Sequence, residues 1–158
     1  MDILRTQYKL LKDSRQVLLN YCESIDPLHF TTTLESFGHG SIRNLLVHIA
    51  ITYQGWLLKF AQDKAVIYFN PDTISTVNDV GNMFEQVNET TDQFLQKFAA
   101  DINLPVTRFI KEKNAAFTAT ALALFTHVTT HEFHHKGQIL SMSRRLGYTP
   151  VDTDLLRF

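Results

Sequence analysis

Residues 124–142 read LFTHVTTHEFHHKGQILSM and carry four of the seven histidines of the chain. Residues four apart on a helix lie one turn above each other, so His127, His131 and His135 would form a column on one face. An imidazole on an apolar face needs a partner, and a metal ion is one such partner. His131 and His135 have the i, i+4 spacing by which one helix offers two nitrogens to one ion. The stretch therefore predicts a long helix with a metal-binding face.

The composition is that of an ordinary globular protein, and we expect residues 1–158 to form a single domain. With 44% hydrophobic and 20% charged residues and a formal net charge of -1, it gives no reason to expect nucleic acid or an anionic membrane as partner. No apolar run approaches the ~20 residues that span a bilayer, and the first residues do not form a signal peptide. A cytoplasmic location is expected. The single cysteine, Cys22, excludes an internal disulfide and is expected in the core.

Four segments repeat apolar residues at steps of three and four, which predicts an all-α fold. The expected helices cover residues 2–23, 42–60, 75 or 76 to about 100, and 118 or 120 to 145. Residues 28–40 are expected as a loop and 63–76 as a crossover connection, while 104–117 alternate in a way that indicates a short extended segment or hairpin. Together they predict a four-helix bundle with long connections. The tail is expected to pack back on the bundle through Tyr148, Val151, Leu155, Leu156 and Phe158.

Three further histidines lie outside the last helix. His29 and His39 fall in the expected loop, where solvated side chains are the first interpretation and a substrate contact is the alternative. His48 lies on the flank of the second helix, where a lone histidine is usually a hydrogen-bonded core residue. It becomes a ligand candidate because His131 and His135 leave room for a third ligand. Trp56, on the same helix, is expected in the core.

The segment from His131 to His135 also matches H-E-x-x-H, the zinc metallopeptidase signature in which the glutamate is the general base. The metzincin extension is missing, because Gln138 and Ser141 stand where it needs glycine and histidine. No glutamate follows Glu132 to serve as third ligand, and the chain before the motif is helical. Glu132 also points about 100° away from His131 around the helix, so we expect it on the helix surface or in contact with a ligand. The peptidase hypothesis therefore ranks below others.

Three stretches together resemble the DinB/YfiT-like superfamily of metal-binding four-helix bundles, over nearly the whole length. They are SIRNLLVHIAITYQGW around His48, HVTTHEFHHKGQIL from His127 and the closing LGYTPVDTDLL. The resemblance implies that His48, His131 and His135 hold the metal. Where the family usually has arginine-glycine-glutamine after the last ligand, this chain has lysine-glycine-glutamine at 136–138.

Three imidazoles on one ion leave a coordination position open, as in catalytic zinc sites. Zinc or nickel suits such ligands best, and iron or manganese also binds them. His127 and Gln138 are the candidate catalytic or pocket residues beside the ion, with an ordinary polar layer of the bundle as the alternative. His134 is expected to pack or to fix a tautomer.

The resemblance implies a metal-dependent enzyme that activates a thiol or water towards a small electrophile, as a thiol S-transferase or hydrolase. A low-molecular-weight thiol would be the cosubstrate. The alternatives are a non-catalytic metal-binding stress or detoxification protein, a structural bundle with a vestigial site and, less favoured, the peptidase. The resemblance also implies a homodimer, since bundles of this family are commonly dimeric, and Phe69, Phe109 and Phe158 are apolar residues to spare for an interface.

Overall fold

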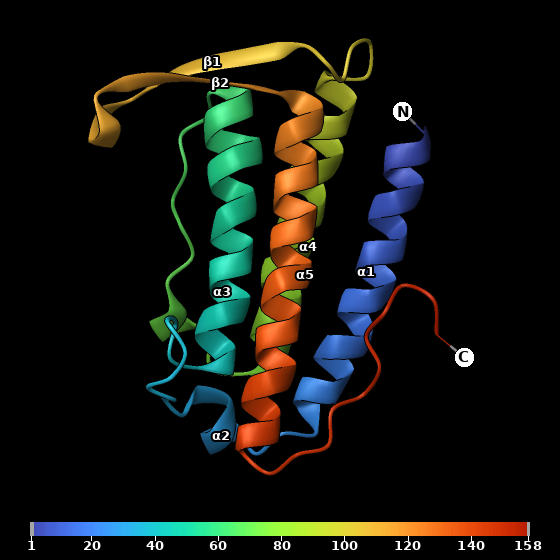
Figure 1. The fold of residues 1–158 in the computed structure, drawn as a ribbon, viewed down its shortest axis with the longest axis vertical. Coiled ribbons are helices and arrows are strands. Elements are labelled where there is room, and N and C mark those ends of the chain that lie inside the picture. The colour runs from blue at the N-terminus through green and yellow to red at the C-terminus, as the bar shows by residue number, and fades with distance from the viewer. Residues whose placement is uncertain (1, 158) are drawn as a thin grey trace.

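Four long helices carry the apolar stripes that the sequence predicts (Figure 1). The computed structural model describes residues 2–157. The helices are α1 (Asp2–Glu23), α3 (Ile42–Tyr53), α4 (Val77–Lys97) and α5 (Ala121–Arg145), and α3 continues into a π-helical segment, η1 (Gln54–Phe60). The predicted four-helix bundle is confirmed.

Three of these helices begin at hydroxyl residues that cap them. Ser41, Thr76 and Thr120 each accept a hydrogen bond through the side-chain oxygen from a backbone N–H three residues later. Thr76 also forms a reciprocal capping box with Asp79, whose carboxylate accepts from the Thr76 backbone N–H. Caps of this kind satisfy N–H groups that have no partner inside the helix, and each contributes about 1 kcal/mol.

The connection before α3 differs from the expected loop, because it begins with a short helix, α2 (Pro27–Thr31). The side chain of Asp26 caps this helix by accepting a hydrogen bond from the Leu28 N–H. Proline is favoured at the first helical position because it has no N–H that would need a partner there. The crossover connection between η1 and α4 is confirmed, and it contains one 3₁₀ turn, η2 (Pro71–Thr73).

A two-stranded antiparallel hairpin stands before α5, as the alternating pattern indicates. Strand β1 (Pro105–Ile110) pairs with β2 (Ala115–Thr120), and the short 3₁₀ segment η3 (Lys111–Lys113) joins them. Asn114 turns the chain with a left-handed φ of 48°. Figure 1 shows the hairpin lying across the end of the bundle where α5 begins.

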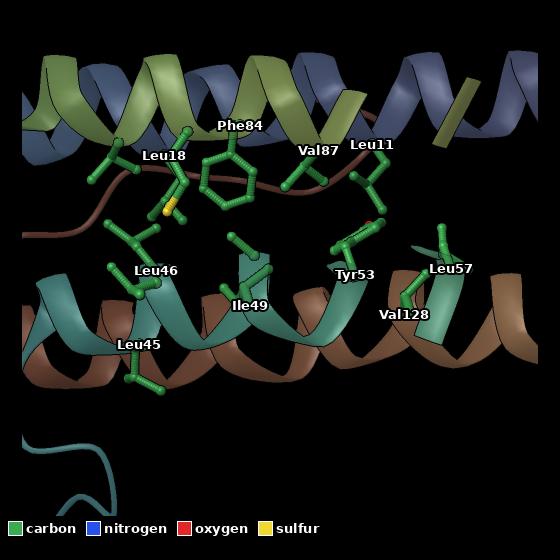
Figure 2. Close-up of a cluster of buried hydrophobic side chains, with 14 of the residues drawn as sticks. Leu11, Leu18, Leu45, Leu46, Ile49, Tyr53, Leu57, Phe84, Val87 and Val128 are labelled. Atoms are coloured by element: carbon green, nitrogen blue, oxygen red, sulfur yellow. The ribbon is translucent and has the colours of Figure 1, made fainter. Parts of the chain in front are cut away.

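The core lies between two layers, with α1 and α4 on one side and α3 and α5 on the other (Figure 2). Its side chains include Leu11, Leu18, Leu46, Ile49, Tyr53, Phe84, Val87 and Val128. Cys22 is buried among them as expected, and burial raises the pKa of its thiol to about 12. Within residues 2–157, none of the helices combines the length and the apolar character needed to cross a bilayer.

The C-terminal tail runs back beside α1, although not through the apolar residues expected to hold it (Figure 1). Val151, Leu155 and Leu156 are exposed, and Phe158 lies outside the described residues. The contact is polar instead: the buried Thr153 carbonyl accepts hydrogen bonds from the Ser14 hydroxyl and from Lys136 Nζ.

Lys136 is thus directed away from the histidine face of α5, and burial lowers the pKa of its amine to about 8. Its ammonium also lies 3.8 Å from the ring centre of Phe133. Of the expected tail contacts, that of Tyr148 is present, because its hydroxyl accepts a hydrogen bond from the Asp26 N–H.

Candidate metal centre

The candidate site lies where α3 and α5 pack together, and it brings His48, His131 and His135 into contact. The Nε2 atom of His131 lies 3.3 Å from Nε2 of His48 and 3.1 Å from Nε2 of His135. Nitrogens bound to one tetrahedral zinc ion at 2.0–2.1 Å lie about 3.3–3.4 Å from one another. Both distances from His131 Nε2 are therefore close to those between nitrogens on one divalent ion.

A fourth imidazole, that of His39, reaches the same place from the connection between α2 and α3. Its ring stacks on His48 with 3.9 Å between ring centres, and one ligand atom each from His39, His48 and His135 lie within 4.8 Å of one another. These three histidines could hold a metal ion. There are thus two possible sets of three ligands, and both contain His48 and His135. The third ligand is His131 on α5 in one set and His39 on the connection in the other.

The expectation that His39 is solvated is therefore wrong. Helical periodicity gives no information on a residue in an irregular segment, so the sequence pattern could not place its ring. The only signal is that Phe37-Gly38-His39-Gly40 directly precedes the Ser41 cap, which starts the helix that carries His48.

Gln138 fixes the orientation of the His135 ring. Its Oε1 atom lies 2.7 Å from His135 Nδ1, and because an amide oxygen only accepts, we assign the proton to that nitrogen. The Nε2 lone pair of neutral His135 then faces His131. The amide nitrogen of Gln138 lies 3.2 Å from Nε2 of His134, an exposed residue. Hydrogen bonds of this kind set the tautomer of metal-binding histidines.

The three facing nitrogens lack the protons that would satisfy them all. If His135 presents a lone pair, His131 Nε2 can donate its one proton towards His135 or His48, and His131 Nδ1 is then an acceptor. Within residues 2–157 that Nδ1 atom is buried without a hydrogen-bond partner, so no contact at Nδ1 fixes the tautomer of His131. A cation among the Nε2 atoms would satisfy all three lone pairs at once.

The surroundings keep these imidazoles neutral. Burial, followed by the nearby rings of His39 and His135, lowers the pKa of His48 to about 4. Burial and the neighbouring histidines, His135 first, lower the pKa of His131 to about 4 as well. The pKa of His135 is also lowered, mainly by burial. Neutral imidazole is the form that binds metal, so the site is ready for an ion at neutral pH.

His127 extends the column of histidines towards the hairpin end of the bundle. Its ring centre lies 5.7 Å from that of His131 and 5.3 Å from that of Trp56, which it meets edge-on. His127 is exposed, so the column rises from the helix interface to the surface. Beside it lies an apolar hollow of about 220 Å³, lined by Trp56, Phe117, Ala119, Ala123, Leu124 and His127.

Trp56 packs against the core but does not lie within it, in contrast to the expectation. It is half-buried and lines both the apolar hollow and a second one of about 410 Å³. The second hollow opens between η1, the crossover connection and β1, and its charged lining residues are Lys59, Asp63 and Arg108. Arg108 Nε is buried there without a hydrogen bond to any described residue, 3.7 Å from the Asp63 carboxylate. Both hollows thus meet at one aromatic side chain.

Glu132 faces the bundle core, so the expectation of a place on the helix surface is wrong. It is 1% exposed, and its two carboxylate oxygens accept hydrogen bonds from Nε and Nη2 of Arg15, both at 2.8 Å. The Tyr53 hydroxyl donates a third bond, also at 2.8 Å. With these partners, the carboxylate points away from the histidine cluster and cannot serve it as a base.

His29 does not join the histidine cluster. It is half-buried in α2, where its Nδ1 atom lies 2.9 Å from the hydroxyl of Tyr148. The expectation of a solvated side chain is therefore wrong for this residue too, but the cause is a contact with the tail.

Comparison with known proteins agrees with this architecture. The family model described as "DinB family" matches residues 2–158. Among solved structures, the crystal structure of TT2238, described as a four-helix bundle protein, superposes with a TM-score of 0.61 at 17% identity. The match covers 87% of this chain and 98% of that chain. At this identity the likeness concerns the fold. A search of curated proteins finds no match.

Proposed function

Since the chain belongs to the DinB family, we propose that it is a metal-dependent enzyme in which His48, His131 and His135 hold one divalent ion. The observation that carries the proposal is the approach of their Nε2 atoms to 3.3 Å and 3.1 Å. The lowered pKa values of all three and the hydrogen bond that orients His135 support it. Zinc or nickel is the ion that such ligands favour, and iron or manganese also binds imidazole.

The proposed reaction is the transfer of a low-molecular-weight thiol to a small electrophile, or the hydrolysis of that electrophile. A divalent ion with an open position supplies a Lewis acid, which lowers the pKa of a thiol or water molecule bound to it. The side chains of this protein do the rest. Gln138 keeps the His135 tautomer fixed, and the apolar packing of α3 against α5 keeps the imidazoles neutral.

The smaller hollow supports an enzyme over a metal-storage protein, because it gives a substrate a place beside His127. The larger hollow adjoins it at Trp56. The apolar group of an electrophile would pack against Trp56 and Phe117 in the smaller hollow. His127, at its edge, is placed to deliver or accept a proton there. An anionic group of either substrate would find Lys59 and Arg108 in the larger hollow.

The alternative of a non-catalytic metal-binding protein shares the same ion and differs only in turnover. The peptidase hypothesis loses support, because Arg15 and Tyr53 occupy the oxygens of Glu132 that a general base would need.

Metal content and turnover test the proposal. Tag-free protein should carry about one ion per chain by elemental analysis, and His48→Ala or His131→Ala should lose it. His29→Ala is the matched control, since it removes a histidine outside the cluster and should keep the ion. Full metal content in either site variant would refute the ligand assignment.

Turnover of chlorodinitrobenzene with several low-molecular-weight thiols then separates an enzyme from a storage protein. His127→Ala should retain the ion and lose about 10²–10⁴-fold in rate if this residue acts in general acid–base catalysis. A metal-loaded protein that turns over no electrophile with any thiol or with water would support the non-catalytic alternative.

A further inference from the structure

The connection between α2 and α3 holds His39 directly over the histidine cluster. Gly40 accepts a hydrogen bond through its carbonyl from the Leu34 N–H at 2.7 Å and donates one from its own N–H to Phe37 at 2.9 Å. Phe37 packs against the core. Gly40 has a φ of +77°, which L side chains rarely adopt, and a Cβ there would meet the Thr33 side chain at 3.4 Å. The position of His39 is therefore determined by the backbone around it.

The His39 ring contacts the two histidines that both possible ligand sets share. It stacks on His48 at an interplanar angle of 25° and meets His135 edge-on, with 5.6 Å between ring centres. The ligand atoms of the three lie within 4.8 Å of one another. An imidazole held this close needs only a small shift to reach an ion bound by its neighbours.

We propose that His39 is a fourth ligand of the same ion and that it occupies the open coordination position until another ligand displaces it. The inference rests on the proposed metal site, and it adds a resting state in which four imidazoles close that site. Structural zinc sites have four protein ligands, whereas catalytic sites keep one position open. Because His39 stands on a connection between helices, its side chain can rotate away from the ion while the backbone turn and the bundle stay in place.

X-ray absorption spectroscopy at the zinc edge, on the zinc-loaded full chain, counts the imidazoles bound to the ion. We expect four in the wild type and three in both His39→Gln and His39→Phe. The two variants separate ligation from packing, because phenylalanine can still stack on His48 but cannot bind zinc. His29→Gln, the matched control, should retain four.

Azide binding to the cobalt-loaded protein, followed by visible absorption, tests the exchange. Azide can bind only while His39 is off the ion. If the fourth coordination position is open one tenth of the time, azide binds the wild type about tenfold more weakly than it binds the two His39 variants. Azide should therefore bind His39→Phe and His39→Gln more tightly than the wild type, by a similar factor.

Three results would overturn the inference. They are three imidazoles in the wild type, an imidazole count that the His39 variants do not change, and azide affinity that is equal in all proteins. A count of three that the His39 variants do not change, or equal azide affinity, would leave the site of His48, His131 and His135 standing. A count of three that falls to two in the His39 variants would instead favour His39, His48 and His135 as the ligands. Wild-type protein that binds no zinc at all would instead refute the proposed function, and the fourth ligand with it.

Discussion

Glu132→Gln should lower the stability of the protein strongly and leave its metal content unchanged. In the structure, the carboxylate accepts two hydrogen bonds from Arg15 and one from Tyr53, each at 2.8 Å. The side chains of Arg15 and Glu132 are only 4% and 1% exposed. Glutamine has the same shape and can still accept the bond from Tyr53, but it removes the charge that balances the guanidinium.

The expected loss is about 3–5 kcal/mol in the free energy of unfolding, the usual cost of leaving one charge of a buried pair uncompensated. For a chain of this length, about 2–4 °C is lost per kcal/mol, so the melting temperature should fall by about 6–20 °C. That is a large share of the total, since domains are stable by only about 5–15 kcal/mol. Arg15 cannot escape by losing its proton, because a guanidinium stays protonated in proteins. In the wild type, burial lowers the pKa of Arg15, but Glu132, Tyr8 and Tyr53 together raise it well above its usual range.

Urea unfolding of the metal-free protein measures this cost without a contribution from bound ion. The matched control is Asp92→Asn, which breaks the exposed pair with Arg5 and should cost no more than about 1 kcal/mol. A double variant, Arg15→Met with Glu132→Leu, removes both charges and should recover much of the loss. If Glu132→Gln costs no more than Asp92→Asn, the buried pair does not stabilise this fold. If it abolishes metal binding in folded protein, Glu132 belongs to the site after all.

Three further predictions concern pH, metal removal and assembly. The metal-free protein should lose stability as the pH falls from about 6.5 to about 4, because histidines in the unfolded chain take up protons before folded His48 and His131 do. In urea unfolding, His131→Gln should lose less stability over this pH range than the wild type. An equal loss in both proteins would show that His131 does not have the lowered pKa. Chelator should lower the melting temperature, because an ion at a thousandfold excess over its dissociation constant adds about 4 kcal/mol of stability. Helical circular dichroism should remain, because the four apolar stripes form the core without the ion. Complete unfolding in chelator would point to a structural metal site. Light scattering should find a homodimer, with Phe109, which is 61% exposed, as a candidate interface residue that Phe109→Ser tests. A wild-type monomer at micromolar concentration would contradict the prediction.

The helices could be predicted because their signals are local. Apolar residues at steps of three and four mark the buried faces, and Ser41, Thr76 and Thr120 mark three of the starts. The same period failed for buried polar residues, since it assigns every charge to the surface. Arg15 and Glu132 are 117 positions apart, and only the packing of α1 against α5 brings them together.

The candidate site divides in the same way. The spacing of His131 and His135 is a property of one helix, so their contact at 3.1 Å follows from the sequence. His48 lies on another helix, and its own pattern does not mark it as a ligand. It is a candidate because His131 and His135 leave room for a third ligand, and the resemblance to a family then implies that role. His39 was missed because its place depends on a hydrogen-bonded turn with a left-handed glycine, for which no periodicity exists.

The H-E-x-x-H match in this chain arises from two separate requirements on the two sides of α5. His131 and Glu132 are neighbours about 100° apart around the helix, so one turns to the cluster and the other to the core. Both nonetheless contact α3: Nε2 of His131 meets that of His48 at 3.3 Å, and Glu132 accepts a bond from the Tyr53 hydroxyl at 2.8 Å. Burial and the Glu132 charge raise the pKa of Tyr53, which keeps its hydroxyl protonated as a donor. The core bond therefore joins α3 and α5 beside the contact between His48 and His131, and Glu132 contributes to the packing of these two helices and not to chemistry at the ion.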